Sequence, residues 1–509
     1  MAANSAEASN ETEIKYEAAA GVTLPSFAEL PQVARTEGAE QEQLDADYFD
    51  TDDLRLIRAG ITLRRRQGGH DAGWHLKVPA GGNTRREIRL PLGRSRQRVP
   101  EELARLVRVH TRGKDLRPVA RISTARTRQL LFDGAGTSLA EVASDDVTAR
   151  ALGDQDRASQ WHEVDVELTG GSRDVLDAAD RLLRRGGLRR SGQSAKLARA
   201  LDLPASAPAR RPPAGAGAAA GEVLLAYLDE QVATLKVYDP MVRSEEPDAV
   251  HQMRTTTRRL RSTLQSFRRF FSGQADELIA ELRWLGGELG SARDAEVLTA
   301  ELEAQLRALP AEMVIGPVAA RIRDQFEGAS RRAREAVLSA LDSPRYFTLL
   351  DRFDELLVRA PVTSRAGRPA RTVLPPALRR TYKRTKQRMK HALSLPPGEQ
   401  ADVALHEARK AAKRARYAGE AVTSAFGAQA QDFARRMKKL QSVLGGHQDA
   451  VIARAAARDL GLTADLEGEN AFSYGIICQR EDDEAARLRR KGQRAWRSAS
   501  RPRARRWLA

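Results

Sequence analysis

Apolar and polar positions alternate with a period of two through the first 200 residues. Successive side chains of a β-strand point to opposite faces, so this alternation predicts strands with one apolar and one polar face. The segments ITLRRR, WHLKVP, REIRL and WHEVDVEL show it most clearly. Helices are expected near residues 101–111 and 174–186. The pattern predicts an antiparallel sheet of about eight strands.

Charges on the polar face of these strands are sorted by sign. One group of strands offers Arg64, Arg66, Lys77 and Arg89, and another offers Glu11, Glu13, Glu163, Asp165 and Glu167. Like charges two residues apart repel by a few tenths to about 1 kcal/mol per close pair. The clusters therefore indicate that the polar face binds a ligand made up of anions and metal ions. The sheet would then be a barrel with the charges inside and an apolar outer face covered by helices. The alternative is an exposed amphipathic sheet with chance charges.

The pattern changes to the helical period after residue 221, and the chain repeats itself. DAVHQMRTTTRRLRSTL from Asp248 aligns with VALHEARKAAKRARYAG from Val403 at an offset of 155 residues. WLGGELGSARDAEV from Trp284 aligns with KLQSVLGGHQDAVI from Lys439 at the same offset. A gap-free repeat over about 50 positions predicts two related helical units.

Each repeat carries a histidine and a basic stripe on one helical face, within an arc of about 80°. The stripes are His251, Arg254, Arg258 and Arg261, then His406, Arg409, Lys413 and Arg416 with Lys410 beside them; a third cluster in RRTYKRTKQRMKH includes Lys383 and Arg384. No acidic residue occurs from Gln252 to Gln274, so the first stripe lacks carboxylate partners on its own helix. A solvated basic face is the plain alternative, but the recurrence favours anion binding.

Positive charge is concentrated in the helical part. Residues 1–200 hold 32 Lys+Arg and 30 Asp+Glu, a net of +2, which leaves 53 and 38, a net of +15, for the rest. Such a field attracts a polyanion. Nucleic-acid readers usually show aromatic stacking platforms or a recognition motif, and neither stands near the basic stripes. Inorganic polyphosphate is therefore favoured over nucleic acid.

Several classes of protein are not expected. The single cysteine, Cys478, allows no internal disulfide or thiolate zinc site and fits a reducing cytoplasm. No apolar run of about 18 residues predicts a membrane span, and MAANSAEASNETE lacks the features of a secretory signal. The sequence contains no P-loop, GxSxG or HExxH motif.

Composition also suggests domain boundaries. We expect a disordered N-terminus at 1–8, a β domain at 9–203, a mobile Pro/Ala/Gly linker at 204–221, a helical domain at 222–497 and a basic tail at 498–509. The helical repeats are expected at about 222–359 and 377–497.

ETEIK, residues 11–15, matches the ExExK signature of the CYTH superfamily of triphosphate tunnel metalloenzymes. YFDTDDLRLIRAGITLRRR, GWHLKVP, TRREIRLPL, LAEVASDDV, WHEVDVEL and SAKLARAL also resemble CYTH segments in order, so the resemblance covers residues 9–203. Residues 220–509 resemble the CHAD domain, a helical module of two repeats known to bind polyphosphate. The resemblance implies an eight-stranded antiparallel β tunnel followed by an all-α two-repeat bundle.

Three groups of tunnel residues follow from the resemblance. Glu11, Glu13 and Lys15 would be catalytic. Mg²⁺ or Mn²⁺ would be held by Glu11, Glu13, Glu163, Asp165 and Glu167, with Glu141 and Asp145 as further metal or water-positioning groups. Triphosphate would be held by Lys15, Arg64, Arg66, Lys77, Arg89 and Lys196, and by Arg121 or Arg126. Period two places these two arginines on opposite faces, and we favour Arg121. Asp165 stands where the family often has Glu, which keeps the charge and shortens the reach.

The expected function is that of a cytoplasmic, metal-dependent inorganic triphosphatase that converts tripolyphosphate to pyrophosphate and phosphate. Its helical domain would bind polyphosphate chains or anchor the enzyme at polyphosphate granules. Three alternatives remain. The tunnel acts on an organic triphosphate such as thiamine triphosphate or a nucleotide, including cyclisation of ATP; the protein is a catalytically weak polyphosphate-binding adaptor; or the basic half binds nucleic acid.

Overall fold

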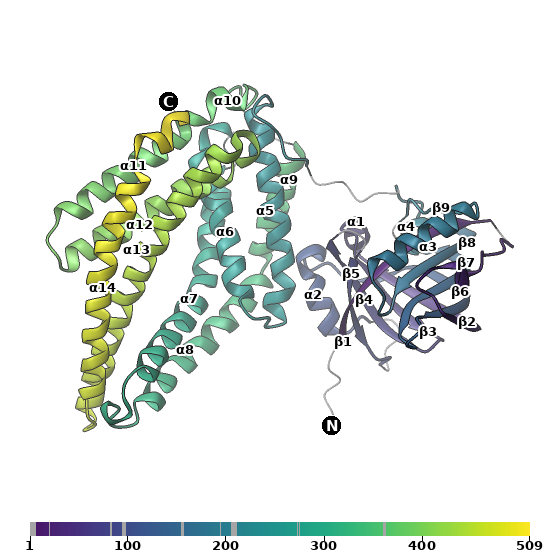
Figure 1. Cartoon of the computed structure of the whole chain (residues 1–509), viewed down its shortest axis with the longest axis horizontal. Coiled ribbons are helices and arrows are strands. Elements are labelled where there is room, and N and C mark those ends of the chain that lie inside the picture. The colour runs from purple at the N-terminus through teal and green to yellow at the C-terminus, as the bar shows by residue number, and fades with distance from the viewer. Residues whose placement is uncertain are drawn as a thin grey trace. The chain divides into compact units, whose positions relative to one another are not determined.

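The computed structural model describes residues 7–19, 21–81, 84–93, 98–153, 157–193, 195–204, 211–271, 273, 275–359 and 363–508. The chain forms two compact units, Met1–Ala209 and Arg210–Ala509. In Figure 1 the first unit runs from purple to blue and the second from teal to yellow. No helix in the described ranges is long and apolar enough to cross a membrane.

An antiparallel barrel forms the first unit. Its strands are β1 (Glu7–Ala18), β2 (Arg35–Asp50), β3 (Thr62–Gln67), β4 (Gly73–Gly81), β5 (Thr84–Leu90), β6 (Arg117–Phe132), β7 (Ser138–Ala151) and β8 (Arg157–Leu168). They pair in the order β5-β4-β3-β2-β6-β7-β8-β1, and β1 also pairs with β5, so the sheet closes on itself. A two-residue strand, β9 (Arg189–Arg190), adds to β1. The closed eight-stranded barrel confirms the predicted tunnel fold.

Helices cover the apolar outer face of the barrel. The helices of this unit are η1 (Phe27–Glu29), α1 (Arg55–Arg58), α2 (Glu101–Thr111), α3 (Arg173–Arg185) and α4 (Lys196–Ala200). Tyr16 and Val164 pack against α3, and Trp74 packs against Leu103 of α2. Burial of an apolar side chain of this size stabilises the fold by roughly 1.5–3 kcal/mol. A slip of one residue would turn these side chains into the lumen, so this packing fixes the register.

The second unit is all-helical, as predicted. Its α-helices are α5 (Ala220–Arg243), α6 (Ala249–Ser266), α7 (Ala275–Arg307), α8 (Val318–Leu341), α9 (Pro344–Arg359), α10 (Ala370–Val373), α11 (Pro375–Ser394), α12 (Glu399–Glu420), α13 (Thr423–Leu466) and α14 (Phe472–Ala499). Short 3-10 helices are η2 (Arg268–Phe270), η3 (Ala311–Met313) and η4 (Pro502–Leu508). The two helices with the basic stripes, α6 and α12, pack against each other.

Two long helical hairpins, α7–α8 and α13–α14, extend from this pair and come together at their far ends (Figure 1). There a buried core joins Leu302 of α7 and Ile322 of α8 to Ala457 of α13 and Ile477 of α14. The helical unit is therefore held together both at the basic helices and at the hairpin tips.

The expected boundaries of the N-terminal segment and of the linker differ from those in the structure. Strand β1 begins at Glu7, inside the segment expected to be disordered. Part of the expected linker belongs to the helical unit: the backbone N–H of Arg211 donates to Asp229 of α5 at 3.0 Å, and α5 itself begins at Ala220. Residues 1–6 and 205–210 lie outside the described residues.

The expected basic tail is folded rather than free. Helix α14 continues to Ala499 and η4 follows, where Leu508 is 2% exposed. The Arg379 guanidinium donates to the carbonyl oxygen of Leu508, with Nε at 2.7 Å. These contacts hold the segment against α11, although chain termini are often poorly ordered.

Candidate active site in the barrel and basic surface of the helical unit

Alternation along β1 turns the ETEIK signature inward. Glu11, Glu13 and Lys15 line the lumen, whereas Ile14 and Tyr16 are buried in the outer core. The lumen encloses about 130 Å³. Its charged lining residues are Glu11, Glu13, Lys15, Glu42, Arg64, Arg66, His70, Asp71, Lys77, Arg85, Arg89, Arg126, Glu141, Asp165, Glu167 and Lys196. Most sequence-predicted site residues thus converge on one cavity.

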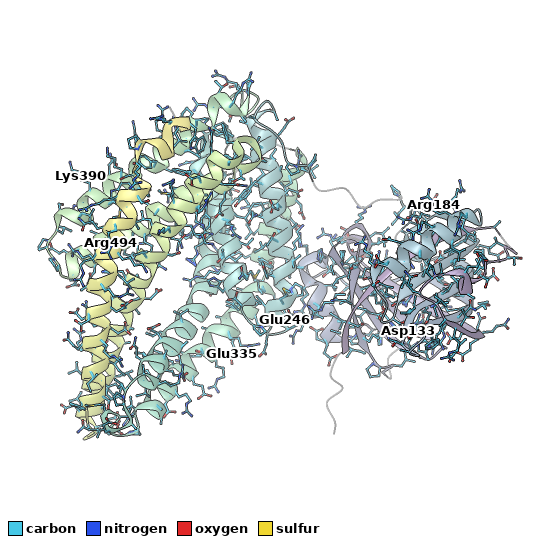
Figure 2. The ribbon with its side chains drawn as sticks, viewed as in Figure 1. Asp133, Arg184, Glu246, Glu335, Lys390 and Arg494 are labelled. Atoms are coloured by element: carbon cyan, nitrogen blue, oxygen red, sulfur yellow. The ribbon has the colours of Figure 1, made fainter. Side chains whose placement is uncertain are left out.

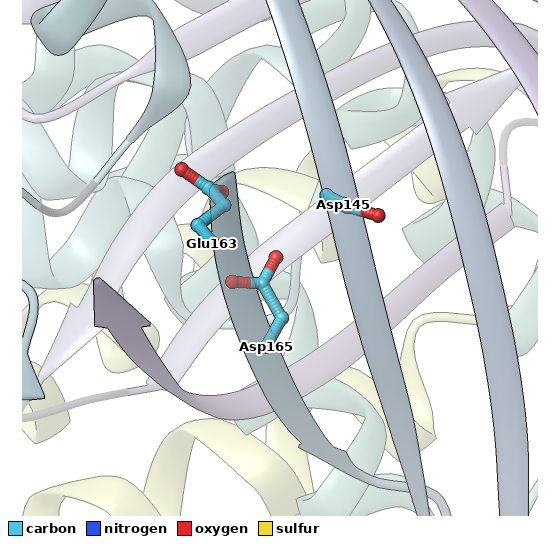
Figure 3. Close-up of side chains that lie close together, drawn as sticks. All are labelled: Asp145, Glu163 and Asp165. Carbon is cyan, nitrogen blue, oxygen red and sulfur yellow. The ribbon is translucent and has the colours of Figure 1, made fainter. Parts of the chain in front are cut away.

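Three buried carboxylates form the deep part of the site (Figure 3). Glu163 and Asp165 follow each other on β8, and Asp145 stands on neighbouring β7 in register with Glu163. One ligand oxygen from each lies within 4.8 Å of the others. The Lys196 ammonium is 2.9 Å from Asp145, 2.5 Å from Glu163 and 3.2 Å from Asp165. The group is therefore built to surround a cation.

Lys15 joins the signature strand to this group. Its ammonium lies 2.8 Å from Glu13 and 2.8 Å from Asp165. Burial alone would lower the pKa of Lys15, but the Asp165 and Glu13 carboxylates raise it well above its usual value. Burial likewise opposes ionisation of Asp165, yet Lys15, Lys196 and Arg126 hold its pKa below the ordinary range. Both groups stay charged at neutral pH.

The structure separates the two candidate arginines of β6. Arg126 points into the lumen and donates two hydrogen bonds to Asp145, from Nε and Nη2, both at 2.8 Å. Arg121 lies on the outer surface, where its Nε donates to Asp47 at 2.8 Å and its side chain is 65% exposed. The preference for Arg121 is therefore wrong about its position, because the inward positions of β6 are the even-numbered ones.

The remaining predicted cations come from β3, β4 and β5. Nη1 of Arg64 donates to the Tyr48 hydroxyl at 3.3 Å, and Arg66 pairs with Asp71. Lys77 pairs with Glu11, whose other carboxylate oxygen lies 3.3 Å from Nη2 of Arg89. These contacts hold the cations in the lumen at fixed positions.

A buried pair outside the predicted site residues supports them. Glu87 on β5 and His75 on β4 are each 1% exposed, and Oε1 of Glu87 lies 2.8 Å from Nδ1 of His75. Nε2 of His75 lies 2.8 Å from the carbonyl oxygen of Asp71. Glu87 also pairs with Arg89 and lies 3.6 Å from Lys77. The alternation in REIRL places Glu87 on the same face as Arg89, so the sequence pattern was sufficient to include Glu87 among the candidate site residues.

Metal ligands can be drawn from the lumen carboxylates. Glu167 is in register with Glu13 on one side and Glu141 on the other, so three carboxylates form a row across β1, β8 and β7. Within the described residues, Oδ1 of Asp165 is buried without a hydrogen-bond partner. Carboxylate oxygens that lack a donor are the ligands that Mg²⁺ and Mn²⁺ prefer. The residues present therefore fit a divalent cation.

The basic stripes of the two helical repeats come together as one inter-repeat cluster, Arg254, Arg258 and Arg261 of α6 with Arg409 and Lys413 of α12. Burial, followed by the charges of Arg258, Arg409, Arg254 and Arg261, lowers the pKa of Lys413 to about 6. In the described chain no carboxylate lies within 4 Å of Arg258, Arg261 or Lys413. Concentrated positive charge of this kind attracts anions.

Repeat symmetry extends to the contacts of the cluster. Arg254 lies over Gly290 of α7, where a Cβ would come 3.4 Å from its Nη2. Arg409 lies over Gly445 of α13, where a Cβ would come 3.5 Å from its Nη2. Both pairs of positions differ by 155 residues (409 − 254 and 445 − 290), the offset of the repeat. The equivalent arginines are therefore held in the same way in both repeats.

Other stripe residues are compensated by carboxylates. Lys410 lies 2.8 Å from Glu407, and Arg416 lies 2.6 Å from Glu420. His251 is half-buried on α6. Burial, followed by the charges of Lys410 and Arg409, lowers the pKa of His406. The second stripe is thus less positive than its composition suggests.

A groove of about 540 Å³ runs along α11. It is lined by Arg380, Lys383, Arg384, Gln387, Arg388 and His391. Lys390 projects from the same helix (Figure 2). Arg384 and Arg261 both lower the pKa of Arg414 on α12, after burial, which places the groove beside the inter-repeat cluster.

Known proteins match both units. The model of the CYTH domain matches residues 9–196, and that of the CHAD domain matches residues 226–458. The CYTH match indicates a superfamily of hydrolases and cyclases that act on triphosphates. An uncharacterized protein from each of two strains of Mycobacterium tuberculosis is 40% identical over 510 residues, which cover 96% of this chain and 96% of the relative.

Solved structures resemble parts of the chain. PptA from Streptomyces chartreusis is 23% identical with a TM-score of 0.46, over 55% of this chain and 100% of its own. The CHAD domain from the plant Ricinus communis is 24% identical with a TM-score of 0.41, over 59% of this chain and 96% of its own. A candidate adenylyl cyclase from Hippeastrum, described as having a dominant triphosphatase activity, is 16% identical with a TM-score of 0.23, over 38% of this chain and 95% of its own.

Both domain models and the full-length relatives confirm the resemblance seen in the sequence. The chain belongs to the family of proteins in which a CYTH domain, here the charged barrel, is followed by a CHAD domain, here the two-repeat helical unit.

Proposed function

We propose that the barrel hydrolyses inorganic triphosphate. A water molecule attacks a terminal phosphorus of tripolyphosphate, the bond from that phosphorus to the bridging oxygen breaks, and orthophosphate and pyrophosphate leave. The observation that carries the proposal is the closed barrel, whose lumen gathers, among the described residues, eight lysine and arginine side chains and seven carboxylates. Phosphoryl transfer needs positioned charge and an in-line nucleophile rather than a covalent group of the protein.

The cations bind the phosphoryl oxygens in this proposal. Lys15, Arg64, Arg66, Lys77, Arg89, Arg126 and Lys196 approach the lumen from five strands and α4. The guanidinium forks can each contact two oxygens, and the ammonium groups act as point charges. Charge that develops on the leaving pyrophosphate is stabilised by groups that are already in place, so little reorganisation is needed.

The carboxylates would hold the metal in this proposal. Glu11, Glu13, Glu163, Asp165 and Glu167 are the proposed ligands, with Glu141 and Asp145 beside them. When bound, Mg²⁺ or Mn²⁺ would supply positive charge next to the phosphoryl oxygens and orient water. Lys15 and Lys196 contact several of these oxygens, and they are the groups that turn from carboxylate to phosphate when substrate enters.

The lining supports an inorganic substrate over an organic one. Among the described residues that line the lumen, Tyr48 is the one aromatic side chain, and its hydroxyl is engaged with Arg64. A nucleobase or thiamine ring would need an apolar or aromatic surface to stack on. Tripolyphosphate needs none.

A non-catalytic adaptor is a second candidate, favoured by one observation. The ammonium of Lys196 forms ion pairs with three of the carboxylates that would hold metal, Asp145, Glu163 and Asp165. If the ammonium kept that position, the barrel would bind polyphosphate without hydrolysis. Metal-dependent turnover separates the two candidates.

The helical unit binds longer polyphosphate in this proposal, through the inter-repeat cluster and the α11 groove with Lys383 and Arg384. A chain of phosphates has charge at every unit and no bases, so it matches a basic surface without stacking platforms. Binding there would keep substrate close to the barrel or hold the enzyme at polyphosphate granules.

Phosphate release from tripolyphosphate, measured with Mg²⁺, with Mn²⁺ and with EDTA, tests the proposal. Pyrophosphate, ATP and thiamine triphosphate are measured in parallel. We expect release from tripolyphosphate that EDTA abolishes, and less from the organic triphosphates. Faster turnover of ATP or thiamine triphosphate than of tripolyphosphate would show that the substrate is an organic triphosphate. Absence of turnover with every triphosphate would favour the non-catalytic adaptor.

A further inference from the structure

Arg258 and Lys413 hold equivalent positions in the two helical repeats. They differ by 155 residues (413 − 258), the offset of the repeat, and they stand on α6 and α12, which pack against each other. Arg254 and Arg409 form the second equivalent pair of the inter-repeat cluster at the same offset. The repeat therefore relates these four side chains, with one departure: the second repeat has a lysine where the first has an arginine.

This departure places one amine that can lose its proton among permanent cations. A guanidinium stays protonated at physiological pH, whereas a lysine loses its proton when it is desolvated or surrounded by positive charge. Lys413 is half-buried, and in the described part of the chain no carboxylate lies within 4 Å of it. Burial, and after it the charge of Arg258, lowers the pKa of Lys413 to about 6. The amine is consequently a largely neutral nucleophile at pH 7.5.

The neighbouring arginines provide donors for a phosphate next to this amine. Nε of Arg258 and Nε of Arg409 are buried, and neither has a hydrogen-bond partner among the described residues. Asp449 lies 4.0 Å from Nη2 of Arg409, at the limit of an ion pair. A buried N–H without an acceptor is unfavourable, and a phosphate oxygen would satisfy it. Arg258 and Arg409 also have the strongest charge effects on Lys413, so the donors and the amine lie close together.

We infer that Lys413 is a modification site for acyl phosphates, which the arginines of the inter-repeat cluster bind by the phosphate while the amine attacks the acyl carbon. An acyl phosphate joins a phosphate and an activated carbonyl through one oxygen, so it matches donors and a nucleophile that lie close together. The N–C bond forms, the bond from the carbonyl carbon to the phosphate oxygen breaks, orthophosphate leaves with the electron pair, and the amine proton passes to solvent. The products are Nζ-acylated Lys413 and orthophosphate.

Acylation of Lys413 and binding of polyphosphate would oppose each other, and this consequence rests on the proposed function. Acylation converts an amine that can take up a proton into a neutral amide, which weakens the attraction for a polyanion. Bound polyphosphate, with a charge at every unit, favours the protonated amine and so protects Lys413 from acylation. The phosphate of one acyl phosphate compensates only part of the charge of the four arginines, so the amine stays available for reaction.

Acetyl phosphate is the probe in the first experiment. Full-length protein is incubated with it at pH 7.5, and acetylation of each lysine is followed by peptide mass spectrometry. Lys410 is the internal control, because it stands on the same helix but is exposed and lies 2.8 Å from Glu407. An ordinary lysine is unprotonated in only about one molecule in a thousand at this pH, so Lys413 should be acetylated at least about tenfold faster than Lys410. Equal rates, or a slower reaction at Lys413, would overturn the inference.

The concentration dependence tests whether the phosphate is recognised. Acetylation of Lys413 should saturate with acetyl phosphate and should be slowed by orthophosphate, which competes for the same arginines. Acetylation of Lys410 should rise linearly and should not respond to orthophosphate. A linear response at Lys413 that orthophosphate leaves unchanged would show that the phosphate is not bound, and would overturn the inference.

Long-chain polyphosphate separates this inference from the proposed function. If both hold, polyphosphate should slow acetylation of Lys413 by about tenfold or more and leave Lys410 unchanged. Fast, saturable acetylation of Lys413 that orthophosphate slows but polyphosphate does not would support the modification site and contradict only polyphosphate binding at the cluster. Polyphosphate binding that calorimetry detects, together with slow acetylation of Lys413, would contradict the modification site and leave the proposed function standing.

Discussion

Glu13 on β1 lies directly opposite Glu167 on β8, on the lumen side of the barrel. Burial raises the pKa of Glu167 to about 7, and the carboxylates of Glu11, Glu13 and Glu141 add to the rise. Like charges at opposed positions destabilise a sheet unless a cation separates them. The fold therefore keeps, at its candidate metal site, a carboxylate that is costly to ionise in the metal-free protein.

Stability of the metal-free protein should depend on pH through Glu167. Its folded pKa lies above its unfolded value, so folding is favoured while the group is protonated, and that stability is lost as pH rises through about 7. Glu167→Gln should then stabilise the chain in EDTA by about 1–2 kcal/mol at pH 8 and by little at pH 5. Thermal unfolding at the two pH values checks this. An equal stabilisation at both pH values would show that Glu167 does not have the raised pKa.

The two arginines of β6 provide a matched pair. Arg126→Ala removes the two hydrogen bonds to buried Asp145, so we expect loss of turnover by at least about 100-fold and a stability cost of about 3 kcal/mol. Arg121→Ala removes an exposed pair with Asp47 and should change turnover and stability little. Kinetics with tripolyphosphate and denaturant unfolding of both variants test this. A larger kinetic effect at Arg121 would contradict the assignment of the lumen.

Glu87 should act through the cations that it holds. Glu87→Gln weakens its contacts with Lys77 and Arg89, and we expect kcat/KM to fall about 10- to 100-fold, as for other groups that orient a site from behind it. Asp180→Asn is the control, because Asp180 is also a buried carboxylate, bound by Tyr16 at 2.9 Å, but outside the lumen. It should lower stability and spare kinetics. A similar kinetic loss in both variants would make Glu87 merely structural.

Polyphosphate binding by the helical unit should strengthen as pH falls from 8 to 6. Burial and four neighbouring arginines lower the pKa of Lys413 to about 6, so the amine is largely neutral at pH 8, and a bound polyanion favours its protonated form. The gain should be about 3- to 10-fold, and Lys413→Met should remove it. Lys410→Met, on the same helix but exposed and paired with Glu407, is the control. Calorimetry at constant ionic strength measures the affinity of the wild type and of both variants at the two pH values. If Lys413→Met still binds more tightly at pH 6, another group is responsible for the pH dependence.

Alternation along the strands predicted the lumen well. It placed Glu11, Glu13 and Lys15 together because a strand has only two faces. The apolar side chains on the other face must pack in the outer core, so the strand cannot shift its register by one residue. It separated Arg121 from Arg126 but could not say which faced inward, since that depends on how β6 pairs with β2 and β7. Glu87 was visible in the same pattern and was not used.

Features made by long-range packing were beyond the sequence pattern. Helix α4 has five residues, too few for a periodic signal, so its burial in the apolar cluster around Trp161 was not predicted. The repeat predicted two equivalent stripes, but their union into one cluster depends on the packing of α6 against α12. The folded C-terminal segment likewise depends on contacts with α11 that arginine-rich composition hides.

The central claim is that the inward-facing ETEIK signature makes the barrel a metal-dependent triphosphatase. It is tested most directly by phosphate release from tripolyphosphate with Mg²⁺ or Mn²⁺, comparing the wild type with Glu11→Ala/Glu13→Ala at equal polyphosphate-binding capacity. The account predicts metal-dependent release by the wild type and a loss of about 1000-fold or more in the double variant, whose helical unit still binds polyphosphate. Undiminished release by the double variant, or none by the wild type, would contradict it.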